Sequence, residues 1–492
     1  MQTSVSIRWS RGAMILLPAL FAAPCRADDG TKAAATLSAT QPGETPATAP
    51  AGQPTGSAGE APRPWLSLGP IPLEIPPLSG ELFHIPYSLH GQATTIPMFH
   101  GHFTSPYAGP NSFQDKNEFD TSYTGTLFLG ARVMPGTEIY FDPEVSAGSG
   151  LSGVAGLGDP PNGETPRVSS ADPSPSTARL FVRQTFGFGG EQEDITDGQN
   201  QIAGKQDISR LTITAGKFAA NDIFDANAYA HDPRSQFFNW AFLDDPAWDY
   251  PADTKGYTEG LALEFNQKNY TLRYGIFREP NDANGGKLDS RLDKGLAQIA
   301  ELEYRYQLFD QQGAVRPMAF LNHARMGDYA ESVALAPNAP DVTATRSYRF
   351  KYGLGINVEQ AITSDLGVFG RAGWNDGHTE TWAFTEVDRS ITLGATLKGT
   401  TWARKDDVLG VAGFMSGLSK DHRDYLAAGG LGFELGDGRL RYAPEQGLET
   451  YYMIALTRNV FLSFDYQFVD HPGFNADRGP VSIGGFRFHV EF

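Results

Sequence analysis

The end of the chain alternates strictly between apolar and ionisable side chains. In residues 484–492 one parity is apolar and runs to Phe492, whereas the other parity holds Arg487, His489 and Glu491. A β-strand places these two sets on opposite faces, so one face is apolar and the other is polar. A barrel that turns its apolar face to lipid and its polar face to water fits this pattern. An edge strand of a soluble β-sandwich is the alternative.

Segments with the same period of two recur from residue 87 onwards. They are about ten residues long, which is the length of a tilted strand that crosses a bilayer. About 16 of them are present, and bacterial single-chain barrels close with an even number of strands. The sequence therefore predicts an all-β fold, a transmembrane antiparallel β-barrel. The expected strands are 87–97, 121–133, 137–145, 178–188, 211–218, 257–265, 269–278, 298–308, 315–323, 346–358, 366–374, 387–398, 407–415, 449–457, 460–469 and 482–492.

The connections between the expected strands are of two kinds. Short ones, such as 266–268 and 311–313, are expected on the periplasmic side. Long ones, such as 219–255, 280–295 and 416–446, are expected to face outward or to fold into the lumen. Because loops on a rigid scaffold carry many binding residues, we expect selectivity to reside in the long loops.

The parity rule assigns most charged side chains of the strands to the lumen. An Arg or Lys on the lipid face costs about 2–4 kcal/mol near the bilayer midplane, so the polar parity is expected to face inward. By the same rule Val387, Ile391 and Leu393 are expected to face lipid. The charged residues assigned to the lumen are Arg179, Arg183, Glu301, Glu303, Arg305, Arg371, Glu386 and Asp388.

A lumen with both signs of charge suits neutral polyhydroxyl solutes. Sugar hydroxyls donate and accept hydrogen bonds, so guanidinium and carboxylate groups can bind them without a net field that would trap an ion. The alternative is that these charges only pair with one another across a wet interior. The strand residues expected to contact sugars are Arg179, Arg183, Glu303, Arg305, Glu386 and Asp388.

The segment 221–251 combines aromatic rings with carboxylates and amides. Such surfaces bind pyranose rings, because the C–H face of the sugar stacks on an aromatic ring while its hydroxyls reach the polar groups. Trp240 and Trp248 are the candidate stacking surfaces. The alternative is that both rings pack the loop against the barrel wall.

The N-terminal region reads as a secretory signal and a leader. Arg8 and Arg11 precede an apolar run at 13–23, which is too short to span a bilayer but has the length of a signal h-region, with cleavage expected after Ala27. A lipoprotein anchor on the neighbouring cysteine is the less favoured alternative. The next residues are rich in Ala, Thr, Pro, Gly and Ser, which cannot bury enough surface to order the chain. We therefore expect a signal peptide at 1–27, a disordered or extended periplasmic leader at 28–80 and the barrel at 81–492.

Composition excludes several other classes of protein. The formal net charge of −18 argues against a nucleic-acid partner. Cys25 is the single cysteine and leaves with the signal, so no thiolate metal site is expected, and we expect no other cofactor or metal. No nucleophile motif is present. Glu386 and Asp388 could form a carboxylate pair, but a wet lumen gives little desolvation to raise a pKa, so we expect no enzyme.

Four longer motifs resemble a known family. The sequence from residue 80 to the end is similar to the carbohydrate-selective porins of the OprB type, with departures in the proline-rich leader and at 146–177. This resemblance implies a monomeric 16-stranded barrel in the bacterial outer membrane that lets mono- or oligosaccharides diffuse passively. A conduit for polysaccharide export and a general small-solute pore are the alternatives. The motifs are 88–94, 105–112, the Asp-Pro-Arg and Asn-Trp-Ala cluster in 221–251, and 477–481.

Phe492 adds a second resemblance. A terminal Phe on an alternating last strand resembles the signal by which the barrel-insertion machinery recognises outer-membrane proteins. The expected partners are therefore sugars, outer-membrane lipid and this machinery.

Overall fold

The structure is a computed structural model that describes residues 74–492 except 166–170 and 309. The predicted signal peptide and most of the predicted leader lie outside the described residues. Within the described part of the chain, no helix is both long and apolar enough to cross a bilayer.

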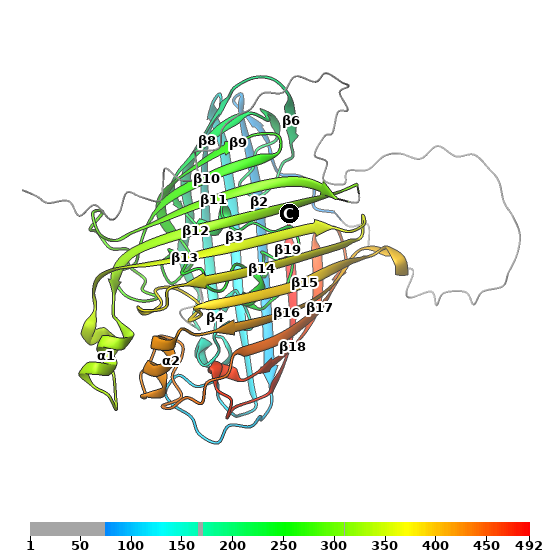
Figure 1. Cartoon of the computed structure of the whole chain (residues 1–492). Coiled ribbons are helices and arrows are strands. Elements are labelled where there is room, and N and C mark those ends of the chain that lie inside the picture. Colours follow the sequence, from blue (N-terminus) through cyan, green and yellow to red (C-terminus); the bar gives the residue numbers. More distant parts are fainter. Residues whose placement is uncertain (1–73, 166–170, 309) are drawn as a thin grey trace, which may run out of the picture. The chain divides into compact units, whose positions relative to one another are not determined.

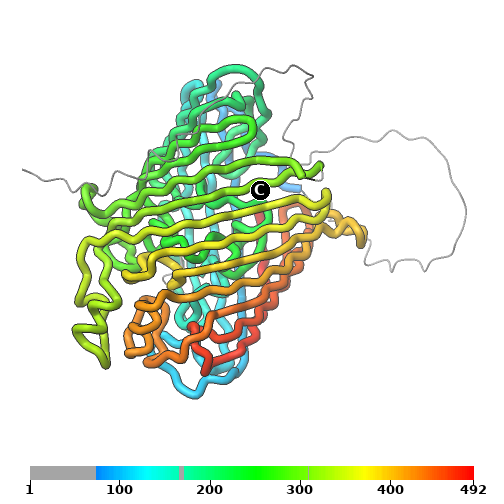
Figure 2. The backbone as a smooth tube through the Cα atoms, viewed as in Figure 1, coloured from blue at the N-terminus to red at the C-terminus, as the bar shows by residue number. Residues whose placement is uncertain are grey.

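Sixteen antiparallel strands form a closed barrel (Figures 1 and 2). Each strand pairs with its neighbours along the chain, and the last strand closes the barrel by pairing with the first. Every predicted strand overlaps one of them. The barrel strands are β2 (Ile85–His100), β3 (Glu118–Met134), β4 (Thr137–Gly148), β5 (Ser174–Gly187), β8 (Arg210–Phe218), β9 (Thr258–Asn266), β10 (Tyr270–Arg278), β11 (Leu296–Leu308), β12 (Gln311–Met326), β13 (Ser347–Ala361), β14 (Leu366–Asn375), β15 (Arg389–Gly399), β16 (Arg404–Gly417), β17 (Glu445–Ala455), β18 (Val460–Asp470) and β19 (Val481–Glu491).

The remaining elements are short. A three-residue strand, β1 (Gly80–Leu82), pairs with the start of β2. Two further strands, β6 (Gln192–Ile195) and β7 (Gly204–Asp207), form a hairpin between β5 and β8. Two helices, α1 (Tyr329–Leu335) and α2 (Lys420–Ala427), lie beside each other at the lower left of Figure 1 and pack through Tyr329 and Tyr425, whose ring centroids are 5.0 Å apart.

The predicted alternation of the strand faces is confirmed. In β19, Phe486 and Phe488 are 40% and 43% exposed. Arg487 and His489, which have the opposite parity, are only 1% and 3% exposed. Val387 is an exception to the prediction, because it is buried in an apolar cluster. The predicted strand 387–398 begins only at Arg389, so the preceding residues belong to a loop that folds over the barrel end.

The two ends of the barrel differ, as expected from the connections. One end carries short turns, and the other carries the long loops together with α1 and α2. The turn predicted at 311–313 is wrong by a few residues, because β11 ends at Leu308 and β12 already begins at Gln311. The connection 188–209 is the exception, because it is long but lies at the end that carries the short turns. The sequence does not predict the β6–β7 hairpin within it.

Candidate solute path through the barrel

The connection from β8 to β9, 219–257, folds into the barrel. On one wall, the backbone N–H groups of Phe238 and Asn239 donate to Glu449 of β17 over 2.6 and 2.9 Å. On another wall, Asp225 donates its N–H to Glu301 of β11 over 2.7 Å and its carboxylate pairs with Arg371 of β14 at 2.9 Å. Side chains of distant strands thus hold this segment, which we call the inner loop, across the lumen.

A second segment enters from the connection between β4 and β5. Pro160 accepts a backbone hydrogen bond from Trp240 of the inner loop over 2.9 Å, and Gly158 donates to Glu445 at the start of β17 over 3.0 Å. Arg234 of the inner loop pairs at 3.0 Å with Glu164 of this segment. Residues 149–165 therefore pack with the inner loop. The sequence marked this region only as a departure from the expected pattern.

Trp240 and Trp248 are buried rather than exposed to a solute. Their exposed fractions are 5% and 2%. The ring of Trp240 stacks on Phe384 with centroids 4.7 Å apart and planes at 22°, and Trp248 meets Tyr250 edge-on at 5.1 Å. The structure therefore favours the alternative in which both rings have a packing role. Trp240 stacks on the loop before β15, and Trp248 belongs to an apolar cluster that includes Met318 and Phe320 of β12.

The wall from β9 to β13 carries a continuous set of ion pairs, which we call the polar ladder. Its centre is Arg273, whose guanidinium reaches Glu264 at 3.1 Å, Glu301 at 2.7 Å and Glu303 at 3.0 Å. Guanidinium–carboxylate hydrogen bonds of this kind are among the stronger ones in proteins. The members of the ladder are Glu264, Arg273, Glu301, Glu303, Arg305, Arg316 and Glu359.

Glu303 extends the ladder in two directions. It accepts from Arg305 at 2.5 Å and from Arg316 at 3.0 Å, and Arg316 continues to Glu359 at 3.0 Å. The side chain of Arg305 is 29% exposed and that of Glu264 25%, whereas Glu301 is fully covered. The middle of the ladder is therefore covered by other residues, whereas its ends at Arg305 and Glu264 are accessible to solutes. The sequence pattern places Glu303 and Arg305 inward. The parity of 269–278 and 315–323 also points Arg273 and Arg316 inward, but it does not mark them, or Glu264 and Glu359, as members of a cluster.

Arg179 and Arg183 point inward from β5, as predicted. Arg179 forms a two-bond pair with Asp222 of the inner loop, at 2.5 and 2.7 Å. Burial favours the neutral form of Asp222, but Arg179 outweighs burial and holds the pKa of this carboxyl below its ordinary value. Arg183 lies over the ring of Tyr140 and donates to the backbone oxygen of Asn200 over 2.9 Å.

Glu386 and Asp388 do not line the lumen wall as part of a strand. They lie just before β15 and are buried under the loop that contains α2. Asp388 accepts from the backbone N–H of Ser419 over 2.8 Å and from His422 over 3.0 Å, and Glu386 accepts from the N–H of Leu435 over 2.7 Å. Burial raises the pKa of Glu386, whereas His422 outweighs burial at Asp388 and lowers its pKa. Both carboxyls therefore fasten this loop.

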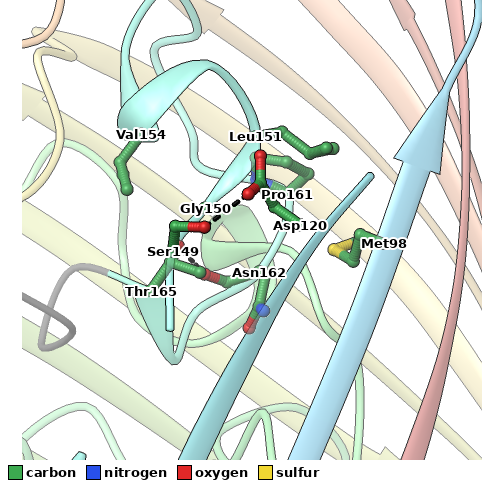
Figure 3. Close-up of a pocket in the computed structure, with 9 residues that line it drawn as sticks. All are labelled: Met98, Asp120, Ser149, Gly150, Leu151, Val154, Pro161, Asn162 and Thr165. Carbon is green, nitrogen blue, oxygen red and sulfur yellow. Dashed lines mark hydrogen bonds between the residues drawn. The ribbon is translucent and has the colours of Figure 1, made fainter. Parts of the chain in front are cut away.

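Two hollows of the structure are lined by residues outside the polar ladder. One of them, beside Met98 and Asp120 and lined also by residues of 149–165 (Figure 3), has a volume of about 10 Å³, which is close to the least volume that holds one water. A larger hollow of about 540 Å³ lies over β15–β18 beside the outward-facing Ile391 and Leu393. Among the residues that the structure describes, no group of three or more His, Cys, Asp or Glu side chains could hold a metal ion.

One family model and one solved structure agree with this architecture. The sequence matches the carbohydrate-selective porin family, OprB, over residues 113–492. The solved structure of OprB of Pseudomonas putida is similar, with 16% sequence identity and a TM-score of 0.61 over 82% of this chain and 94% of that chain. The outer-membrane channel DcaP of Acinetobacter baumannii is 9% identical, with a TM-score of 0.47 over 86% of this chain and 100% of that chain. A comparison with curated proteins gave no match.

Proposed function

Because this chain belongs to the carbohydrate-selective porin family, OprB, we propose that sugars cross its barrel along the polar ladder. The protein is a porin of the bacterial outer membrane for the passive diffusion of sugars.

One observation carries this proposal, the mixed charge of the polar ladder. Three guanidiniums and four carboxylates follow one another over five adjacent strands. At the exposed ends, Glu264 offers an acceptor to a solute, and Arg305, which also donates to Thr271 and to the backbone oxygen of Tyr270, can exchange these hydrogen bonds with one. Because each charge already has a partner, a passing sugar can exchange hydrogen bonds with the ladder without having to neutralise an isolated charge. Such a surface binds a polyhydroxyl solute weakly enough to release it.

We propose Arg305 and Glu264, at the exposed ends of the ladder, as sugar contacts, together with Arg179 of β5, which pairs with the inner loop. Glu303 and Arg273, in the covered middle of the ladder, hold these end residues in position. Arg179 is included because its partner Asp222 belongs to the inner loop and is 28% exposed at its side chain. The other predicted contacts take different roles. Glu386 and Asp388 fasten the loop that holds α2, and Trp240 and Trp248 fasten the inner loop.

The Arg305→Gln variant tests this path. We expect block of single-channel current by glucose to weaken about tenfold, because a hydrogen bond from a charged group contributes about 1.5–3 kcal/mol and 1.4 kcal/mol is a factor of ten. Planar-bilayer recording with glucose titration measures the block. Liposome swelling with glucose, oligosaccharides and amino acids of similar size gives the accompanying selectivity.

Arg278→Gln is the matched control, since Arg278 pairs with Glu259 on the outward parity of its strand. It should leave glucose block unchanged. Unchanged block in Arg305→Gln would remove the polar ladder from the sugar path, and equal permeation of all small solutes by the wild type would indicate a general pore.

We further propose that the barrel acts as a monomer and performs no catalysis. The family and the fold indicate a channel, and the carboxyl pair Glu386 and Asp388 is occupied by His422 and by backbone N–H groups. Light scattering in detergent should give one chain per micelle, and incubation with oligosaccharides should release no smaller product.

A further inference from the structure

The hairpin of β6 and β7 sends its connecting segment into the barrel. We call residues 196–203 the lip. The lip connects β6 to β7, at the end of the barrel that carries the short turns. Reciprocal backbone hydrogen bonds between Gly198 and Gln201, at 3.1 and 3.0 Å, hold its tip in a tight turn. Asn200 at this tip has a φ of +55°, a left-handed conformation that Asn tolerates better than most residues.

The side chains of the lip reach three strands of the wall. Asn200 donates to Asp142 of β4 over 2.8 Å. Asp197 lies 3.2 Å from His90 of β2. Gln199 donates over 3.4 Å to Glu491 at the end of β19.

Two arginines bind the backbone of the lip. Arg132 of β3 donates to the carbonyl oxygens of Ile202 and Ala203 over 3.1 and 3.3 Å. Arg183 of β5 donates to the carbonyl oxygen of Asn200 over 2.9 Å. Through its backbone and its side chains, the lip therefore contacts inward-facing residues of five consecutive strands, β19, β2, β3, β4 and β5.

An apolar anchor supplements these polar contacts. Ile202 is 3% exposed and belongs to the same apolar cluster as Tyr140 and Phe181. A turn that extended from the barrel into the periplasm would leave the side chain of Ile202 exposed to water. Burial of Ile202 against the inner wall instead places the lip inside the mouth of the barrel.

We propose that the lip is a size-selecting constriction at the periplasmic mouth of the pore. A sugar that leaves the polar ladder on β9–β13 must pass between the lip and that opposite part of the wall. Arg132 and Arg183 are positioning residues that latch the lip, so Arg183 acts on solutes through the lip rather than by direct contact. The inference deepens the proposed function and rests on it.

The direct test replaces residues 192–207 with Asn-Gly, which joins β5 to β8 by a short turn. Liposome swelling with glucose, a disaccharide and a trisaccharide should show the trisaccharide-to-glucose rate ratio rising several-fold, and single-channel conductance should rise. A matched replacement of the turn 400–403 by Asn-Gly, at the same end of the barrel but outside the lip, should change neither quantity.

The double variant Arg132→Met with Arg183→Met tests the latch without shortening the chain. Heat-modifiable gel migration establishes that each variant has folded. A folded lip variant with an unchanged rate ratio in both designs would overturn the proposal. If instead glucose block changed while the size dependence stayed the same, the lip would belong to the sugar-binding path and the constriction would be refuted.

The two proposals fail in different ways. Substitution in the polar ladder should alter the preference between a sugar and an amino acid of equal size, whereas release of the lip should alter only the dependence on solute size. A wild type that shows no sugar preference but a lip variant that passes larger solutes would contradict the ladder and support the lip.

Discussion

Arg273 illustrates what parity alone can predict for a single residue. The alternation along β10 places it inward, but its partners depend on strand register. In the structure it stands directly opposite Glu264 of β9 and Glu301 of β11, so one guanidinium completes two cross-strand pairs. Register depends on the turns and on the pairing of neighbouring strands, neither of which the parity of a single strand specifies.

The tryptophans of the inner loop show a different limit. An aromatic ring beside carboxylates has the same local sequence whether it stacks on a sugar or on another ring. For Trp240 the deciding residue is Phe384, which lies far along the chain in the loop before β15. The local sequence alone therefore does not distinguish the two roles.

Trp240→Ala should lower stability without changing sugar affinity. Removing a buried Trp side chain costs about 3–5 kcal/mol in the free energy of unfolding, and here it also removes the stack on Phe384. The unfolding temperature should fall and the single-channel current should become noisy, while the relative affinity for glucose stays constant. Thermal unfolding in detergent and glucose titration in a planar bilayer measure the two effects.

Trp402→Ala is the control for this substitution, because Trp402 lies in the short turn before β16 and is only half-buried. It should reduce stability less. If glucose blocked the current of the Trp240→Ala variant more weakly while the stability of the variant was unchanged, Trp240 would be a stacking surface for sugars.

At the scale of elements, the sequence predicts the barrel strands, whose pattern repeats along the chain, but not the β6–β7 hairpin, which lacks this pattern. Ten-residue strands with one apolar parity carry the signal in every copy, so all sixteen were found. The β6–β7 hairpin was missed because its strands are four residues each and almost wholly polar, Gln-Glu-Asp-Ile and Gly-Lys-Gln-Asp. A short strand without an apolar face does not differ from a loop in its pattern.

The inner loop and the segment 149–165 add buried carboxyls that make stability depend on pH. Burial raises the pKa of Asp159 to about 7, against the hydrogen bond that Ser416 donates over 2.6 Å and with a further contribution from Asp245. In an unfolded chain the pKa of Asp is about 3.9. Between about pH 4 and pH 7 the folded state therefore holds a proton that the unfolded state has lost.

It follows that stability falls as pH rises through this window. The contribution of Asp159 is fully present below about pH 4, declines by up to about 1.4 kcal/mol for each pH unit, and is absent above about pH 7. Asp159→Asn should flatten the dependence of the unfolding temperature on pH between 4 and 7. Asp194→Asn, at an exposed position of β6, should leave it unchanged, and equal slopes in wild type and Asp159→Asn would show that Asp159 is ionised in the fold.

At the scale of the whole molecule, closure removes the free edges that an open sheet would expose. β19 pairs with β2 from Glu491↔Gln92 to Ile483↔His100. Beyond the strand, Phe492 exchanges two backbone hydrogen bonds with Gly91, at 3.0 and 3.1 Å. Its ring lies where a Cβ on Gly91 would come within 2.5 Å, so glycine at position 91 makes room for the terminal aromatic side chain.

The contacts of Phe492 with Gly91 allow its expected recognition by the insertion machinery to be tested separately from closure of the barrel. Deleting Phe492 removes two backbone hydrogen bonds and one ring but leaves the β19–β2 pairing intact. Detergent-refolded protein should therefore keep a β-dominated far-UV circular dichroism spectrum and heat-modifiable migration, while insertion into the outer membrane of cells should fall several-fold. Glu491→Gln keeps the terminal Phe and should insert normally. Normal insertion of the deletion variant would show that the machinery reads another part of the strand, whereas failure of the variant to refold in detergent would show that Phe492 acts in closure itself.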